Sequence, residues 1–455
     1  MTTGALALWM LEQEARGLMT RLDRVKPFVL QETMVPAASL APAAQSAIEE
    51  YLLRGRRELR SRVLDYLRWL QGPGRTAGPV ECQRRFTFLR LRFNSALGQM
   101  DLFGDAITQR SEHETGVWLS GLDVAAADAL TLPGRFFEAP PIVCYLHRGL
   151  GGAIRRARTR LPGGGENPVS IVRIPRERMI GYGVASSLVH EVGHQGAALL
   201  GLVESMRPAL QEAQHRAASH VRPAWQLWER WVSEIVADFW SIAKVGISST
   251  LGLIGVVSLP RWFVFRINVD DPHPFPWIRV MLSCAIGDEL YPHPQWRRVA
   301  DTWEAFYPIA GIDPKGAELA KQLRATIQPF VALIVGHRPA SLQGRSLRQV
   351  LPVPDRTPER LVRYFRTWRD APEAMRSASP CLVFAALGQA RASGLISPEE
   401  ESRKLGELIT HWAITSTLDV SARSAIAQGV ETPPGLSQRA GRKPGGSRIG
   451  LTTAS

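Results

Sequence analysis

Apolar residues recur at helical spacing along most of the chain. In the first 130 residues, Leu6–Leu30 and Ala44–Leu70 are periodic segments, and a helical pattern continues over 85–130. After residue 300 the spacing is helical again, and Thr357-Pro358-Glu359 and Ser397-Pro398-Glu399 are typical helix starts. No repeat period stands out, and a mostly helical protein is predicted.

The pattern changes to short strands between these helical regions. Pro141–Leu146 is a short apolar run and Val169–Ile174 alternates, so both are interpreted as strands. Gly149–Leu161 is interpreted as a basic helix and Pro162–Pro168 as a loop. The glycines at the start of that predicted helix lack the third glycine of a dinucleotide site and any Gly-Lys-Ser/Thr, so Gly149–Gly152 is interpreted as a tight turn.

A five-residue run, His190-Glu191-Val192-Gly193-His194, lies in an apolar, helix-compatible stretch. Residues four apart share one face of a helix, so both imidazoles can reach a single ion. Glu191 then lies beside that ion, where it can take a proton from a metal-bound water. Gly193 leaves room for a close neighbour. The alternative is a pair of histidines satisfied within a helical core.

A second helical segment, Trp231–Trp240, carries Glu234 and Asp238 one helical turn apart. Two acids in so apolar a segment are costly to bury unless something pairs with them. A bound cation and a histidine that ligates it would pair both. The alternative is a solvated stripe on an amphipathic helix.

These two motifs together resemble the gluzincin clan of zinc peptidases, in which H-E-x-x-H is followed by E-x-x-x-D on a second helix. The resemblance implies that His190, His194 and Glu234 bind Zn2+, and that Glu191 is the general base. It also implies that Asp238 holds one of the ligating histidines, for which His190 is our first choice.

A third element extends the resemblance. Asp271-Pro272-His273-Pro274, with Arg279 six residues after the histidine, is similar to a His-Pro with a nearby arginine in the CAAX prenyl protease and heat-shock protease X group. The resemblance covers about residues 140 to 290. His273 is our first choice for a donor that stabilises an oxyanion, and Arg279 and Tyr182 are alternative oxyanion or substrate contacts.

The predicted fold class is α+β and mostly helical, with a zincin-like catalytic core that contains a small sheet. The predicted regions are a helical N-terminal region (1–130), the core (131–300), a helical C-terminal region (301–429) and a disordered basic tail (430–455). In peptidases of this kind, the strand just before the zinc-binding helix offers an edge to an extended substrate.

We expect a zinc-dependent peptidase that hydrolyses amide bonds through a metal-activated water, with a peptide or protein as its substrate. Two other hypotheses stay open: a non-catalytic binding or scaffold protein stabilised by its metal, and a zinc hydrolase that acts on a non-peptide substrate. Glu191 argues against the scaffold, because a purely structural site needs no base.

Composition narrows the class of protein further. The four cysteines, Cys82, Cys144, Cys284 and Cys381, are far apart and are predicted to be free, buried thiols in a reducing compartment. No basic start precedes an apolar run, so no signal peptide is predicted and a cytoplasmic location is expected. The net charge of +13 is nearly all arginine and is dispersed, so nucleic acid is not an expected partner.

One segment, Gly246–Phe265, is apolar enough to raise the question of a membrane. Its serines, Pro260 and Arg261 interrupt it, whereas a spanning helix needs about 20 apolar residues. We therefore expect a helix that packs against the catalytic helices or lines the substrate cleft, and contact with a membrane stays open as the less favoured alternative. The four tryptophans nearby are predicted to be core residues: Trp225, Trp228, Trp231 and Trp240. The sequence leaves the oligomeric state open.

Overall fold

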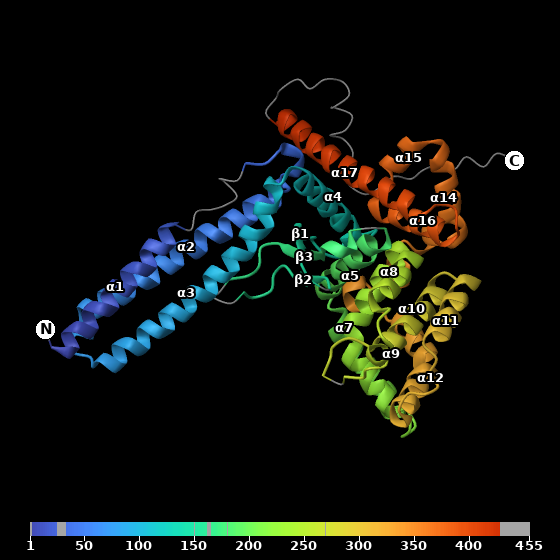
Figure 1. The fold of residues 1–455 in the computed structure, drawn as a ribbon, viewed down its shortest axis with the longest axis horizontal. Coiled ribbons are helices and arrows are strands. Elements are labelled where there is room, and N and C mark those ends of the chain that lie inside the picture. Colours follow the sequence, from blue (N-terminus) through green and yellow to red (C-terminus); the bar gives the residue numbers. More distant parts are fainter. Residues whose placement is uncertain are drawn as a thin grey trace. The chain divides into compact units, whose positions relative to one another are not determined.

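The computed structural model describes residues 2–24, 33–149, 151–161, 165–179, 181–268 and 270–427. They are mostly helical with one small sheet, as predicted (Figure 1). They form two compact units. The N-terminal unit holds 1–120, 140–145 and 155–171, and the C-terminal unit holds 121–139, 146–154 and the chain from 172 onward. The division differs from the predicted regions, because the helices after residue 300 belong to the same unit as the two motif helices.

Three long helices make up most of the N-terminal unit: α1 (Thr3–Arg24), α2 (Pro42–Gln71) and α3 (Pro79–Thr108). Each packs against the other two (Figure 1). Residues such as Leu18, Val63 and Phe93 are buried in their core. Residues 25–30, the end of the first predicted helix, lie outside the described residues. Three 3-10 turns and a fourth helix complete this part of the chain: η2 (Pro36–Ala38), η3 (Pro73–Arg75), η4 (Gln109–Ser111) and α4 (His113–Leu130).

The sheet has three strands, β1 (Ile142–His147), β2 (Ala153–Arg155) and β3 (Ser170–Pro175), in the order β1-β3-β2. The two predicted strands are confirmed as β1 and β3. Because β3 is the central strand, both of its sides are paired. The expectation that β3 offers a free edge to a substrate is therefore wrong, and the outer strands are β1 and β2.

The predicted basic helix at 149–161 is also wrong. Gly149 and Gly151 have φ angles of 140° and 84°, and Arg158 has a φ of 61°, all outside the right-handed helical region. The segment instead forms a turn, then β2, then a hairpin. In the hairpin, the amide of Arg158 donates to the carbonyl of Asn167 and the amide of Asn167 donates to the carbonyl of Thr159, and a bridge joins Arg160 to Glu166. Of the loop predicted at 162–168, residues 162–164 lie outside the described residues.

The C-terminal unit is built around α5 (Tyr182–Leu199), which carries the H-E-x-x-H run, and α7 (Arg222–Val245), which carries Glu234 and Asp238. Helices α7 and α8 (Ile247–Val257) both pack against α5. The helix starts predicted at Thr357-Pro358 and Ser397-Pro398 are confirmed. The other elements of this part of the chain are η5 (Arg176–Arg178), α6 (Leu202–Arg216), α9 (Arg261–Val264), α10 (Pro276–Leu290), α11 (Pro294–Phe306), α12 (Pro314–Gly336), η6 (Ala340–Leu342), α13 (Leu347–Val350), η7 (Val353–Arg356), α14 (Pro358–Asp370), α15 (Pro372–Ser377), α16 (Pro380–Ala392) and α17 (Pro398–Ala427).

Glycines bring the helices around α5 into backbone contact. A Cβ atom at Gly193 would lie 3.0 Å from the Cα of Ala237 and from the Cβ of Trp240 on α7. On the side of α8, a Cβ at Gly252 would lie 2.3 Å from the Cβ of Ser186. The close neighbour expected at Gly193 is thus α7, and the bare glycine surface sets the distance between the two motif helices.

The remaining expectations about the core are met. All four nearby tryptophans are buried, and the Nε1–H of Trp240 donates a hydrogen bond to the carbonyl of Ala129. The four cysteines are free and buried. The apolar segment at 246–265 forms α8, which packs on α5, and then the short α9. Within the described residues, no helix is both long enough and apolar enough to span a bilayer.

We expect Gly193→Val to destabilise the C-terminal unit, because the new side chain must displace the backbone of Ala237. Overpacking of this kind costs about 1–3 kcal/mol, which lowers the melting temperature by several degrees. The matched control is Gly255→Ala on α8, where a Cβ meets nothing within 4 Å. That change should stabilise the protein by about 0.5–1 kcal/mol. Equal melting temperatures for wild type and Gly193→Val would contradict the tight approach of α5 and α7.

Candidate metal centre

Two helices place the candidate ligands on facing sides. His190 and His194 lie one turn apart on α5, and Glu234 lies opposite them on α7. The Nε2 atom of His190 is 3.3 Å from Oε2 of Glu234, and the Nε2 atom of His194 is 3.3 Å from Oε1. All three residues offer ligand atoms that lie within 4.8 Å of one another. The structure therefore brings together the three residues that the sequence proposed as ligands.

These separations fit one small ion. Two atoms that bind zinc tetrahedrally at about 2.0–2.1 Å lie about 3.3–3.4 Å apart, by simple trigonometry. Each imidazole-to-carboxylate distance has this value, and the two distances end on different oxygens of Glu234. The donor set of two nitrogens and one oxygen suits Zn2+ and similar transition metals better than Mg2+ or Ca2+, which prefer oxygen ligands.

The carboxylate of Glu234 supports the same fit. Its Oε2 atom is buried and makes no well-formed hydrogen bond within the described residues, although three nitrogen-bearing side chains surround it. Burial raises the pKa of Glu234, but the contacts with His190 and His194 outweigh it and hold this pKa well below its usual range. An ionised, buried oxygen without a donor is expensive unless a cation occupies the space beside it. Because Glu234 and Asp238 are both buried, the alternative of a solvated stripe on this helix is wrong.

Asp238 lies behind His190, as expected. Its Oδ1 atom is 2.8 Å from Nδ1 of His190, at an angle that falls short of a well-formed hydrogen bond. Burial lowers the pKa of His190, but Asp238 and Glu234 raise it more, to about 9. A metal ion must displace the proton that this imidazole holds at neutral pH, so metal binding releases a proton.

Arg279 on α10 forms an ion pair with Asp238. Its Nε and Nη2 atoms donate to the two carboxylate oxygens at 2.7 and 2.9 Å, and Nη2 lies 3.6 Å from Oε2 of Glu234. Burial raises the pKa of Asp238, but Arg279 and His190 outweigh it and keep this pKa well below its usual range. The Arg279 side chain is 12% exposed and its two hydrogen bonds hold Asp238 in place, while a contact of Arg279 with an oxyanion or substrate stays a prediction.

His273 borders the cluster from the segment between α9 and α10. Its Nε2 atom is 3.4 Å from Oε2 of Glu234, and half of its side chain is exposed. Asp271 accepts hydrogen bonds from the backbone amide of His273 at 3.0 Å and from its Nδ1 at 2.7 Å. With Nδ1–H donating to Asp271, Nε2 carries a hydrogen only in the imidazolium form. His273 can therefore donate to an oxyanion when it is protonated.

Tyr182 lies away from the cluster. It begins α5, eight residues before His190, which is about 12 Å along the helix axis. The guanidinium of Arg391 lies 3.9 Å from the centre of the Tyr182 ring, and burial raises the pKa of Tyr182 to about 12. Within the described residues no contact joins Tyr182 to the cluster, so the structure gives no support for an oxyanion contact by this residue.

Gly152 is a site residue that the sequence did not identify. It lies between β1 and β2, and a Cβ atom built on it would be 2.7 Å from Oε1 of Glu191. The sequence shows only a glycine pair after a strand. Its position beside Glu191 is a contact between residues that lie far apart in the chain, which no local pattern encodes.

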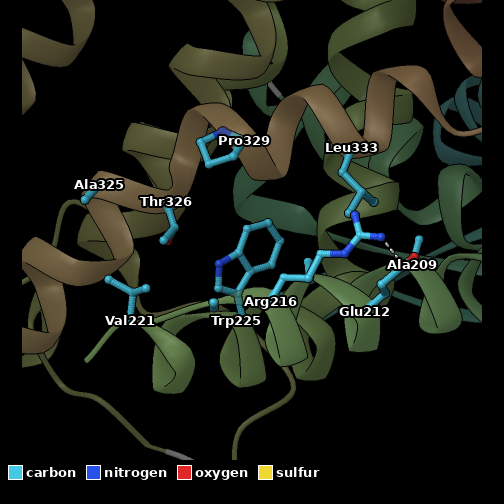
Figure 2. Close-up of a pocket in the computed structure, with 11 residues that line it drawn as sticks. Ala209, Glu212, Arg216, Val221, Trp225, Ala325, Thr326, Pro329 and Leu333 are labelled. Carbon is cyan, nitrogen blue, oxygen red and sulfur yellow. Dashed lines mark hydrogen bonds and ion pairs between the residues drawn. The ribbon is translucent and has the colours of Figure 1, made fainter. Parts of the chain in front are cut away.

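An open pocket of about 640 Å³ lies apart from the metal centre, between α6, the first turn of α7 and α12 (Figure 2). The ring of Trp225 faces Pro329 across it, and Arg216 pairs with Glu212 beside it. Its walls are mostly apolar and include none of the residues of the metal centre. The pocket therefore holds no candidate metal ligand and no candidate general base.

Comparison of the chain with protein-family models, with curated protein sequences and with solved structures found no match. The interpretation of this site therefore rests on the motifs and on the geometry of the described residues.

We expect the purified protein to bind about one zinc ion per chain. Glu234→Ala removes one of three ligands and should weaken zinc binding by at least about 100-fold, measured by competition with a chromogenic chelator. Glu229→Ala is the matched control, since Glu229 lies on the same helix and contacts Gln211 and Gln214 instead. Equal zinc affinity in the two variants would reject Glu234 as a ligand.

Asp238→Ala should weaken zinc affinity by about 10–100-fold, because His190 loses the group that orients it. It also leaves Arg279 buried without its partner, which costs about 3–5 kcal/mol of stability. Asp238→Asn should be nearly as damaging, since one amide oxygen cannot serve both Arg279 and His190. The double variant Asp238→Ala/Arg279→Ala should regain stability but not zinc affinity. Wild-type affinity in Asp238→Asn would show that the charge of this carboxylate is dispensable.

Proposed function

We propose that this protein is a zinc-dependent peptidase of the gluzincin type, with a zincin-like core at about residues 140 to 290. The observation that carries the proposal is the grouping of His190, His194 and Glu234, whose ligand atoms lie within 4.8 Å of one another, with Glu191 adjacent in the chain. Such an ion supplies a Lewis acid that acidifies water and polarises a carbonyl group.

The charge of the cluster supports a divalent cation. Glu191, Glu234 and Asp238 are buried, and the guanidinium of Arg279 contacts Glu234 and Asp238. Three carboxylates against one guanidinium leave two negative charges, which a divalent ion would neutralise. Without such an ion, a proton on His190 offsets only part of this charge.

Each residue of the chain has a defined task in this proposal. Glu191 takes the proton of the attacking water and delivers it to the leaving nitrogen. His273, held by Asp271, donates to the oxyanion that develops on the scissile carbonyl. Asp238 and Arg279 keep His190 oriented and so act through it.

The sheet favours a peptide as the substrate. Strand β2 has β3 on one side only, and Gly152, which immediately precedes β2, lies against Glu191. An extended peptide that adds to the outer side of β2 would run its backbone past the general base. A scaffold protein has no need of an acid at Glu191. A zinc hydrolase for non-peptide substrates would leave the outer side of β2 without a role.

A reducing compartment such as the cytoplasm is part of the proposal. It rests on the four cysteines, which are all free and buried.

We expect Glu191→Gln to keep the fold and the zinc while lowering the rate of peptide hydrolysis by about 100- to 10,000-fold, because only the base is lost. The assay uses a pool of internally quenched fluorescent peptides and a matched panel of ester and nucleotide substrates, with zinc content measured in parallel. Glu204→Gln, an exposed acid on α6, is the control and should hydrolyse at the wild-type rate.

Hydrolysis by Glu191→Gln within about tenfold of wild type would reject the base assignment. Turnover of the ester or nucleotide panel with none of the peptides would replace the peptidase by another zinc hydrolase. Zinc binding without turnover of either panel would favour the scaffold.

A further inference from the structure

Gly152 has no conformational reason to be a glycine. Its φ lies outside the left-handed region, unlike those of Gly149 and Gly151, so any residue could adopt its backbone shape. What excludes a side chain is Glu191. A Cβ at this position would meet Oε1, Cγ and Cδ of Glu191 at 2.7, 3.2 and 3.3 Å. No other residue is among the three nearest atoms.

The contact constrains Glu191 more than it constrains the fold. Glu191 is 9% exposed, and its neighbours in the chain, His190 and Val192, are held by α7 and by the core. If a methyl group were added at Gly152, the carboxylate at the far end of a flexible side chain would shift before the backbone did. The new position would be displaced from the one beside the candidate metal ligands.

We propose that Gly152 is a positioning residue, whose bare backbone sets where the carboxylate of Glu191 lies. This inference rests on the proposed function, because it concerns the base of that reaction. The general base of a hydrolase must lie within hydrogen-bond reach of its water, and a misplacement of about 1 Å can cost about 100-fold in rate. The close approach of the Gly152 backbone to the Glu191 side chain supplies this constraint through shape.

The test is a double-mutant cycle between positions 152 and 191, read with the quenched peptides, zinc content and melting temperature. Gly152→Ala should lower kcat by about 10- to 100-fold, with KM and zinc content within about threefold of wild type. Asp is one methylene shorter than Glu, so Glu191→Asp frees the space that the methyl group needs. In the Glu191→Asp background, Gly152→Ala should therefore cost less than about threefold.

Gly406→Ala on α17, where a Cβ meets nothing within 4 Å, is the control and should leave kcat unchanged. If Gly152→Ala lowers the melting temperature or fails to fold, Glu191→Asp must restore it, since the three atoms nearest to the added Cβ all belong to the Glu191 side chain.

Three results would overturn the inference: an unchanged kcat in Gly152→Ala, a raised KM with kcat unchanged, or an equal loss in both backgrounds. The second would assign the glycine to the approach of the substrate backbone. Failure of the proposed function looks different, because wild type itself would then hydrolyse none of the peptides.

Discussion

The backbone contact between α5 and α7 at Gly193 is the constraint on which the candidate site depends. Because a Cβ there would lie 3.0 Å from the Cα of Ala237, any larger residue would push the two helices apart. Glu234 and Asp238 flank Ala237 on α7, three residues before it and one residue after it. Their short carboxylate side chains reach His190 at 3.3 and 2.8 Å only at this separation. The glycine therefore sets the size of the space between the imidazoles and Glu234.

Charge explains why so polar a cluster is stable inside an apolar unit. Asp238 is neutralised by Arg279 in a two-point ion pair, and this pair is complete without any ligand. The carboxylate of Glu234 lacks a full set of partners, since its Oε2 atom has no well-formed hydrogen bond within the described residues. The unmet charge is thus concentrated on the side of the carboxylate that faces the histidines. We interpret this asymmetry as the mark of a binding site rather than of a structural ion-pair network.

Features with local spacing were predictable from the sequence, and those that need tertiary contacts were not. Each motif places two residues four positions apart. The helical repeat therefore predicts that His190 and His194 share one helix face, and that Glu234 and Asp238 share another. The commitment of Arg279 to Asp238 joins α10 to α7, and no spacing encodes it. The central place of β3 is equally non-local, because strand order is set by pairing across the sheet. The helix predicted at 149–161 is wrong because Gly149 and Gly151 adopt positive φ angles, which the composition of the segment does not reveal.

The rotation of α5 about its axis links the metal centre to the base. Successive residues on a helix are about 100° apart, so when His190 faces Glu234, Glu191 points about 100° around the axis. Gly193 and Gly252 lock that rotation, because α7 and α8 touch the α5 backbone on two sides. The carboxylate of Glu191 is thereby directed at the segment before β2, where Gly152 leaves room for it. A single rotational position of α5 therefore places the candidate ligands toward Glu234 and the general base toward Gly152. A rotation large enough to move Glu191 away from Gly152 would also turn His190 and His194 away from Glu234.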